Sequence, residues 1–274
     1  MSLFYIILGV LGGLCTLGVI LILLYVLFLI RPQRKAPPSP NLLCDYAHRG
    51  LHGNGVPENS LAAFEAACRA GYGIELDVQL SADGEVMVFH DYTLIRMTGR
   101  EGSVCDCTAA ELMGFSLAET EQTIPTFSEV LELVDGRVPL LVELKGEDLN
   151  ASLCPKVAAL LREYRGDFCI ESFNPLLLRA MRREMPEAYI GQLYTNVCKE
   201  KKKVNPTNLL LTGMALNFLS KPHFIAYDTR YRGSIPVRLT TKVYKAERFV
   251  WTVRDTDTLR IAHEKGEHPI FERI

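Results

Sequence analysis

The sequence predicts an α/β fold, a (β/α)8 TIM barrel with an inserted segment after strand 2, preceded by one N-terminal transmembrane helix. Three observations predict it. Short apolar runs alternate with stretches of helical periodicity, which is typical of a mainly parallel sheet. About eight such runs follow residue 41, in a segment of the length that one barrel of this kind needs. The first 30 residues contain no charged side chain.

Residues 1–30 form the predicted transmembrane helix, because about 20 apolar residues suffice to cross the hydrocarbon core of a bilayer. A cleaved signal peptide is the alternative, but the basic start and the small-residue cleavage site of such a peptide are missing. Arg31, Arg34 and Lys35 follow the helix, and the positive-inside tendency places this basic flank in the cytoplasm. We therefore expect a single-pass protein of the cell membrane whose globular part is cytoplasmic.

Residues 31–41 are a basic, proline-containing spacer, and residues 42–274 form the barrel domain. The predicted strands cover residues 44–48, 74–80, 140–145, 168–173, 189–194, 224–228, 249–253 and 269–272. Helices are predicted over residues 60–70, 126–134, 151–164 and 175–184. Residues 85–122 are too long for an ordinary crossover and carry a strand of their own at 85–89, so they indicate an insertion over one barrel mouth.

The formal net charge of −2 argues against binding to nucleic acid, which requires a basic face to replace the counterions around phosphates. The eight cysteines are scattered through apolar segments, which favours free and mostly buried thiols over disulfides. Cys105 and Cys107 do not have the spacing of a zinc or redox pair. Any phosphate chemistry must therefore be local, and structural zinc is not expected.

Two carboxylates, Glu75 and Asp77, are separated by one residue on the second predicted strand, so both point to the same face. Glu143 and Lys145 repeat this spacing on the third strand. Like charges that lie close together in a barrel mouth require a cation. Three oxygen ligands without clustered cysteine or histidine favour a hard divalent metal, Ca²⁺ or Mg²⁺, and the residues do not choose between the two.

Two histidines stand at the ends of predicted strands, where barrels place catalytic groups. His48 precedes Arg49, and His90 precedes Asp91. Such a pair, with a guanidinium beside one member, suits proton transfer on either side of a phosphate. A single histidine is more often a packed or surface residue, and this is our interpretation of the remaining four: His52, His223, His263 and His268.

Several ordered motifs add a resemblance to these observations. They are HRG at 48–50, PEN at 57–59, ELD at 75–77, HD at 90–91, ELK at 143–145, SFNP at 172–175 and WTV at 251–253. In this order the motifs are far more specific than any one alone, and the chain from residue 45 onwards resembles the glycerophosphodiester phosphodiesterase family. The resemblance implies the barrel with an insertion after its second strand. It also implies that Glu75, Asp77 and Glu143 bind the metal, with His48 and His90 as general acid and base.

The same resemblance implies roles in substrate binding. Arg49 and Lys145 would hold phosphoryl oxygens, and Trp251 would line the pocket for the glycerol or another alcohol group. Without the resemblance, a tryptophan in a strand is more often a core residue. Glu58 and Asn59 of the PEN motif are expected in a turn beside the site.

The activity that the resemblance implies is metal-dependent hydrolysis of glycerophosphodiesters, such as glycerophosphocholine or glycerophosphoethanolamine, to an alcohol and glycerol 3-phosphate. One alternative is a membrane-associated lysophospholipase D that acts on lysophospholipids. Leu94, Ile95 and Met97 of the insertion would favour it, although core packing explains them equally well. The other alternative, a non-catalytic barrel that binds phosphate ligands, is disfavoured because both histidines and all three carboxylates are present.

Two features depart from the family pattern. The chain ends EHPIFERI at 267–274, where the family usually has a Gly-Ile-Thr-Asp-Pro type of ending and a further helical segment. Glu171 is unusually polar for the fourth strand, and we expect it to extend the polar floor of the site.

Overall fold

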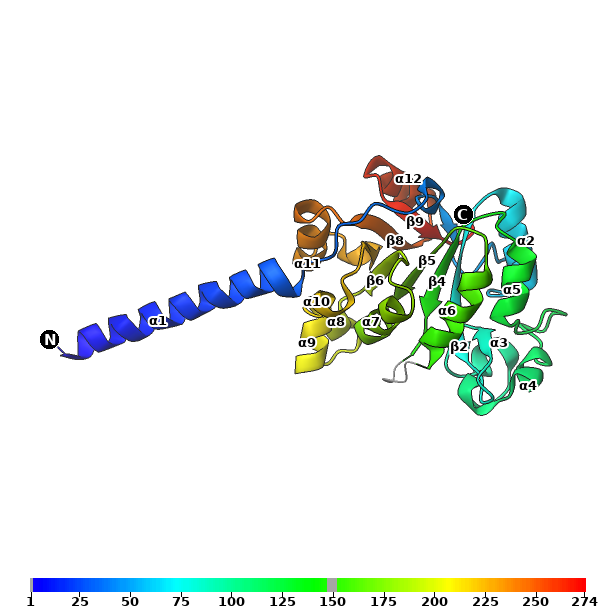
Figure 1. Ribbon diagram of the computed structural model, residues 1–274, viewed down its shortest axis with the longest axis horizontal. Coiled ribbons are helices and arrows are strands. Elements are labelled where there is room, and N and C mark those ends of the chain that lie inside the picture. Colours follow the sequence, from blue (N-terminus) through cyan, green and yellow to red (C-terminus); the bar gives the residue numbers. More distant parts are fainter. Residues whose placement is uncertain (1, 147–151) are drawn as a thin grey trace.

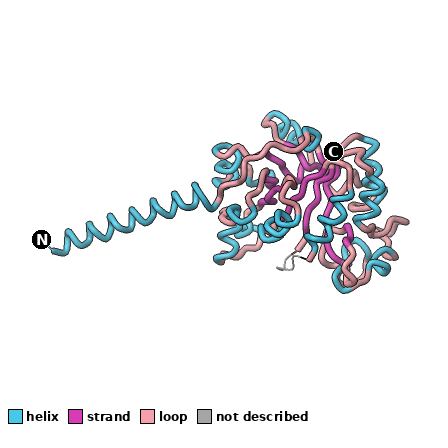
Figure 2. The backbone as a smooth tube through the Cα atoms, in the orientation of Figure 1, coloured by secondary structure: helices cyan, strands magenta, loops and turns pink. Residues whose placement is uncertain are grey.

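The computed structural model describes residues 2–146 and 152–274. A ring of strands is surrounded by helices, and one long helix projects from the side of this barrel (Figures 1 and 2). The parallel strands are β1 (Tyr46–Ala47), β2 (Gly73–Leu80), β4 (Leu140–Leu144), β5 (Phe168–Ser172), β6 (Ile190–Tyr194), β7 (Phe224–Asp228), β8 (Glu247–Val253) and β9 (His268–Phe271). Each of them corresponds to one predicted strand.

The ring closes because β1 pairs with both β2 and β9. The atypical final strand therefore completes the barrel, with a register irregularity against β8 between Val250 and Val253. β1 is shorter than predicted because the chain turns directly after it, with φ of +55° at Arg49 and +79° at Gly50. A Cβ atom at Gly50 would lie 2.8 Å from the Cβ of Ala63, so this turn requires glycine.

Apolar side chains fill the interior of the barrel below its mouth, and other apolar side chains cover the outer face of the strands. Tyr46, Leu141, Phe224 and Phe249 belong to the cluster inside the ring. A larger cluster joins the outer faces of the strands to the helices, and Ile74, Leu76 and Val78 of β2 contribute to it. Successive strand residues point to opposite faces, so Glu75 and Asp77, which alternate with these three, face the interior of the barrel. They lie above the apolar cluster inside the ring. This inner cluster is therefore the floor of the barrel mouth.

The four predicted helices are present as α2 (Leu61–Ala70), α5 (Phe127–Val134), α6 (Leu153–Glu163) and α7 (Pro175–Glu184). Residue 151 of the predicted third helix lies outside the described residues. Ser60 caps α2 by accepting a hydrogen bond from the Ala63 N–H, and Thr126 caps α5 within a capping box. The remaining short helices are η2 (Pro40–Leu42), α8 (Val197–Glu200), α9 (Pro206–Thr212), α10 (Asn217–Ser220), η4 (Thr229–Tyr231), α11 (Ile235–Arg238), η5 (Leu239–Val243) and α12 (Thr256–Glu264).

The predicted insertion forms a small unit of its own beside β2. It contains β3 (Val86–Val88), α3 (Ile95–Thr98), η3 (Val104–Asp106) and α4 (Ala109–Met113). β3 pairs antiparallel with β2, and a separate apolar cluster holds the unit together. Leu94 and Met97 are buried in that cluster, whereas Ile95 is exposed. Core packing therefore accounts for Leu94 and Met97.

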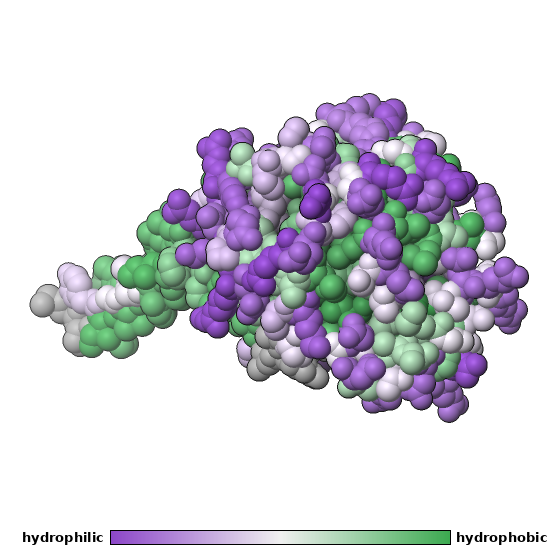
Figure 3. Space-filling view, turned by 45° about the vertical axis from the view of Figure 1, so that its right-hand side comes forward, coloured by the Kyte–Doolittle hydropathy of each residue, from purple (hydrophilic) through white to green (hydrophobic). Residues whose placement is uncertain are grey.

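The projecting segment consists of α1 (Ser2–Leu24) and the continuing turn η1 (Tyr25–Leu29). Leu3–Leu29 is long and apolar enough to cross a membrane, a property that signal sequences share. Figure 3 shows it as an apolar rod beside a barrel surface with many polar side chains. At its base, Ile30 is fully buried and its carbonyl oxygen accepts a 2.9 Å hydrogen bond from Asn217 Nδ2. The Tyr25 hydroxyl donates a 2.8 Å hydrogen bond to the Gly213 carbonyl.

The predicted spacer at 31–41 lies along the barrel and is bonded to it. The Gln33 N–H donates to the Pro222 carbonyl at 2.9 Å, and Lys35 Nζ donates to the Glu187 carbonyl at 2.7 Å. Asn41 Nδ2 lies 2.8 Å from an Asp167 carboxylate oxygen. These contacts fix the path of the chain between the projecting helix and β1.

Candidate active site

Three carboxylates converge at the mouth of the barrel, as the strand spacing predicts. Glu75 and Asp77 extend from β2, and Glu143 extends from the neighbouring β4, where it is the register partner of Asp77. Each residue offers one oxygen, and these oxygens lie within 4.8 Å of one another. All three residues are less than 9% exposed. The fold thus gathers three acidic groups in a site with little water.

Two cationic side chains partly balance this charge. Lys145 Nζ lies 3.0 Å from Asp77 Oδ1 and 2.9 Å from Glu143 Oε1. The Arg49 guanidinium pairs with Glu58 at 2.7 Å, and its Nε lies 3.7 Å from Asp77 Oδ2. The predicted cations are therefore both at the site, held by its carboxylates.

The HRG and PEN turns contribute further polar contacts. The Arg49 N–H donates a 2.8 Å hydrogen bond to Glu75 Oε2. Asn59 is buried, with φ of +52°, and its Nδ2 donates to Asp77 Oδ2 at 2.8 Å. The other end of this amide, Oδ1, has no hydrogen-bond partner among the described residues. An unpaired buried acceptor beside three carboxylates is suited to a cation.

The pKa values of the carboxylic acids show how crowded the charges are. Burial raises the pKa of Glu75 well above its usual range, and the charges of Asp77 and Glu143 raise it further. Burial also raises the pKa of Glu143, to about 7, although Lys145 opposes the shift. Burial disfavours ionisation of Asp77 too, but Lys145 and then His90 and Arg49 lower its pKa overall. Full ionisation of the cluster therefore requires more positive charge, and these oxygen ligands fit a hard divalent cation.

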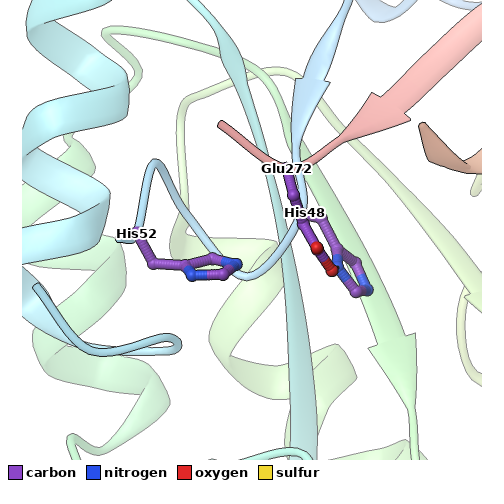
Figure 4. A group of neighbouring side chains, drawn as sticks. All are labelled: His48, His52 and Glu272. Carbon is purple, nitrogen blue, oxygen red and sulfur yellow. The ribbon is translucent and has the colours of Figure 1, made fainter. Parts of the chain in front are cut away.

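His48 follows β1 and is held by a carboxylate from the other end of the chain. Its Nδ1 lies 3.1 Å from Glu272 Oε1, directly after β9, and its Nε2 lies 3.9 Å from Glu75 Oε2. Figure 4 shows the ring of His48 beside Glu272, with the side chain of His52 extending toward the pair from a neighbouring loop. Burial lowers the pKa of His48, against the hydrogen bond with Glu272.

His90, which lines the same cavity, is held in a similar way. Its Nδ1 lies 2.6 Å from Asp91 Oδ1, and Asp91 is in turn held by Arg96 at 2.5 Å. Burial lowers the pKa of His90, and the charge of Asp77 partly opposes this shift. In both histidines a carboxylate thus engages Nδ1.

A cavity of about 640 Å³ lies over these residues and is lined by both histidines, Arg49, Glu75 and Glu143. The predicted pocket residue Trp251 lines it as well, with its ring edge-to-face with Phe173 at 5.6 Å. The indole Nε1 donates a 3.0 Å hydrogen bond to the Ala226 carbonyl, which fixes the ring.

Glu171 also lines the cavity and is buried, as expected of a polar floor, and burial followed by the charge of Glu75 raises its pKa. The structure adds lining residues that the sequence did not single out. Asp228 ends β7, Arg230 follows it in η4, and the two form an ion pair at 2.5 Å. The sequence also did not single out Glu272, which holds His48 and is not among the lining residues of the cavity. It follows β9, and its position at the C-terminal end of a strand was the available signal.

Residues 48–272 match the family described as the Glycerophosphoryl diester phosphodiesterase family. The chain belongs to this family. Among its relatives, the glycerophosphodiester phosphodiesterase of Caldanaerobacter subterraneus subsp. tengcongensis is 40% identical over 159 residues, which cover 54% of this chain and 65% of that protein. The Bacillus altitudinis protein of the same name is 44% identical over 167 residues, which cover 56% of this chain and 66% of that protein. The matches thus span just under two thirds of either relative.

Solved structures from this family confirm the fold. A phosphodiesterase of Oleispira antarctica, in complex with the product sn-glycerol-3-phosphate, superimposes with a TM-score of 0.69 at 23% identity, covering 84% of this chain and 92% of that one. The glycerophosphodiester phosphodiesterase of Thermotoga maritima superimposes with a TM-score of 0.65 at 24% identity. This match covers 83% of the present chain and 94% of the Thermotoga maritima chain. The family member described here is accordingly a TIM barrel.

Proposed function

We propose that this family member hydrolyses glycerophosphodiesters, such as glycerophosphocholine or glycerophosphoethanolamine, to an alcohol and glycerol 3-phosphate. The observation that carries the proposal is the convergence of Glu75, Asp77 and Glu143 with His48 and His90 around one cavity. Family membership supports the same reaction. So does the relative of similar fold whose structure contains sn-glycerol-3-phosphate.

Glu75, Asp77 and Glu143 would hold a Ca²⁺ or Mg²⁺ ion, since their oxygens are close together and buried. When bound, the ion supplies positive charge to the phosphoryl oxygens. Arg49 and Lys145 would bind the same oxygens once the substrate phosphate competes with their present carboxylate partners for these two cations. Both cations lie beside the carboxylate cluster, so they could contact a phosphate that is bound there.

His48 and His90 would exchange protons with the attacking and leaving oxygens. Because Nδ1 of each ring is engaged by a carboxylate, Nε2 is the atom left to face the substrate. One ring takes a proton from the nucleophile, and the other gives a proton to the leaving alkoxide. Trp251 and Phe173 form an apolar wall of the cavity, against which the carbon skeleton of glycerol would lie.

We also propose that Leu3–Leu29 anchors the barrel in the cell membrane as a single pass, with residues 31–41 as the connection and 42–274 as the barrel domain. The burial of Ile30 and its hydrogen bond with Asn217 support an anchor that remains attached. Arg31, Arg34 and Lys35 favour a cytoplasmic barrel.

The test measures phosphodiesterase activity of the full chain in detergent on glycerophosphocholine, with EDTA, Ca²⁺ or Mg²⁺. We expect activity that requires one of the metals and falls about 10²-fold or more in His48→Ala. His263→Ala is the matched control, because His263 lies on α12 and pairs only with Asp45 in the described structure. Turnover that survives in His48→Ala, or no turnover with either metal, contradicts the proposal.

A further inference from the structure

A second cavity, of about 760 Å³, lies beside the first one at the barrel mouth. Both are lined by Glu143, Phe173 and Leu193, so the two cavities meet over the carboxylates. The proposed reaction on a small glycerophosphodiester requires only the end of the second cavity that Glu143 and Lys145 line. Its volume is within the range of pockets that enclose a medium-sized organic ligand.

The second cavity is charged at the end that adjoins the first cavity, and it has an apolar wall farther away. Glu143 and Lys145 line the end that adjoins the first cavity. Leu210, Leu211, Met214 and Leu216, from α9 and the turn after it, line the far part. Polar side chains of the same region line the cavity beside them: Glu200, Lys201, Thr207, Asn208 and Asn217. A ligand that fits this distribution has an anionic head and an apolar tail.

The apolar end lies on the side of the barrel that carries the proposed anchor. In Figure 1, α9 and α10 lie on the side from which α1 projects. Tyr25 of the anchor bonds to Gly213, directly after α9, at 2.8 Å. The ring of Phe28 packs against Phe218 of α10 with centroids 5.6 Å apart. α9 is therefore adjacent to the point where the chain would enter the bilayer.

The surface of this segment matches a bilayer. Val204, Leu209 and Leu210 are 73%, 55% and 42% exposed. Exposed leucines at a membrane anchor can contact hydrocarbon and are not left in water. The basic run Lys199, Lys201, Lys202 and Lys203 precedes α9 and can contact anionic headgroups. Leu210 is both exposed and part of the cavity wall, which places an entrance on this side.

We infer that the second cavity binds the acyl chain of a lysophospholipid drawn from the bilayer across α9, a substrate class that rests on the proposed function. The phosphodiester then lies at Glu143 and Lys145, and the chain lies between Leu210, Leu211 and Met214. Water forms the new bond to phosphorus while the bond from phosphorus to the headgroup oxygen breaks. The headgroup leaves as an alcohol with one proton from water, and the acylated glycerol phosphate remains.

This placement differs from the one that the sequence suggested. Leu94 and Met97 are buried in the core of the insertion, and Ile95 is exposed away from the lining of both cavities. The apolar wall comes instead from α9, which the proposed anchor contacts.

The direct test is photocrosslinking of the full chain in vesicles of phosphatidylcholine and phosphatidylglycerol. The probe is a lysophosphatidylcholine with a diazirine at the end of its chain, in EDTA so that metal-dependent turnover does not consume it. Adducts are located by mass spectrometry. We expect them within residues 210–216. Adducts confined to the anchor Leu3–Leu29 overturn the inference.

Adjacent leucines of α9 supply a matched pair of variants. Leu210→Glu puts a carboxylate into the cavity wall, whereas Leu209→Glu puts the same group on the same helix outside the lining. Adduct yield within 210–216 should fall roughly tenfold in Leu210→Glu, because a charge disfavours an apolar chain beside it. It should fall less in Leu209→Glu, which alters the bilayer-facing surface of α9 and not the cavity wall. Equal yields in the two variants overturn the inference.

Turnover separates this inference from the proposed function. If the wild type cleaves glycerophosphocholine but not lysophosphatidylcholine in the vesicles, the acyl-chain site is wrong and the proposed function stands. If it cleaves both, the ratio of the two rates should fall in Leu210→Glu and not in Leu209→Glu. If it cleaves neither with Ca²⁺ or Mg²⁺, the proposed function fails. Adducts within 210–216 then still support a lipid-chain site, and their absence overturns it.

Discussion

Nδ1 of His48 lies 3.1 Å from Oε1 of Glu272, across the seam where the first and last strands of the barrel pair. Arg254 holds the same carboxylate through two hydrogen bonds, at 2.7 and 2.9 Å. The hydrogen bond with His48, followed by that with Arg254, lowers the pKa of Glu272 to about 2 despite partial burial. Glu272 is therefore ionised at neutral pH and orients the ring of His48.

Glu272→Gln should lower kcat about tenfold or more and leave KM nearly unchanged, because the ring loses its charged partner while the substrate pocket is kept. Steady-state kinetics on glycerophosphocholine measures both constants. Glu272→Asp should recover part of kcat, since it restores the charge. A higher KM with unchanged kcat, or no recovery of kcat with aspartate, would contradict this positioning role.

Metal binding should stabilise the fold. Excess Ca²⁺ or Mg²⁺ should raise the free energy of unfolding by roughly 2–3 kcal/mol at about 100 times the dissociation constant. Asp77→Asn should abolish the gain, because it removes a buried ligand with a lowered pKa. Thermal unfolding of the full chain in detergent, with and without EDTA, measures the effect. Glu121→Gln, on an exposed loop, is the control and should keep the full metal response.

Trp251→Ala should raise KM for glycerophosphocholine about tenfold, because the apolar wall formed with Phe173 is lost, and should change kcat less. Trp251→Phe retains a ring and should stay near the wild-type KM. Initial rates over a range of substrate concentrations distinguish the two constants. Similar KM values for the alanine variant and the wild type would remove Trp251 from the pocket.

Stability should fall in mild acid because of His223. Burial, and then the charges of Arg182 and Lys35, lower its pKa to about 3, while its Nδ1 accepts a 3.0 Å hydrogen bond from the Ile190 N–H. The unfolded chain takes up a proton below its own pKa of about 6.5 and the folded chain does not until about pH 3. Stability is thus fully present above pH 6.5 and decreases below it, by about 1.4 kcal/mol per pH unit.

Urea unfolding of the full chain in detergent at pH 7.5 and pH 5 measures this dependence. His223→Asn should have a lower free energy of unfolding at pH 7.5, since the ring packs against Tyr189 at 5.2 Å. The decrease in its free energy of unfolding from pH 7.5 to pH 5 should be smaller than that of the wild type. An equal decrease in the free energy of unfolding in both proteins would exclude His223 as the source of the pH dependence.

The proposed anchor should remain on the mature protein and in the membrane. Intact-mass measurement should find residues 2–30 present, and the protein should resist extraction by alkaline carbonate. Protease added to sealed, right-side-out cells or spheroplasts should spare the barrel and digest it only after lysis. Digestion before lysis would reverse the orientation expected from Arg31, Arg34 and Lys35.

Most of the barrel could be predicted from the sequence, because parallel strands buried on both faces appear as short apolar runs. The meeting of Glu75 with Asp77 follows from the two-residue period of one strand. Glu143 joins them because β4 is the next strand in the ring. Period and strand order are local properties, and the sequence displays both.

Features that depend on closure could not be predicted in the same way. The contact between His48 and Glu272 joins residues at opposite ends of the barrel and exists only because β1 pairs with β9. The short helices α8, α9 and α10 have too few turns to show a period. The second cavity depends on both their packing and the path of the anchor.

Pairing of β1 with β9 also orders the events of biosynthesis. The apolar helix is synthesised before the barrel, and the ring stays open until the last strand has been made. During that interval the proposed anchor would tether the unfinished barrel, with its unpaired strand edges, to a bilayer through Ile30 and the preceding helix. Tethering separates nascent copies from one another and from cytosolic chains, so the open edges have fewer partners with which to aggregate.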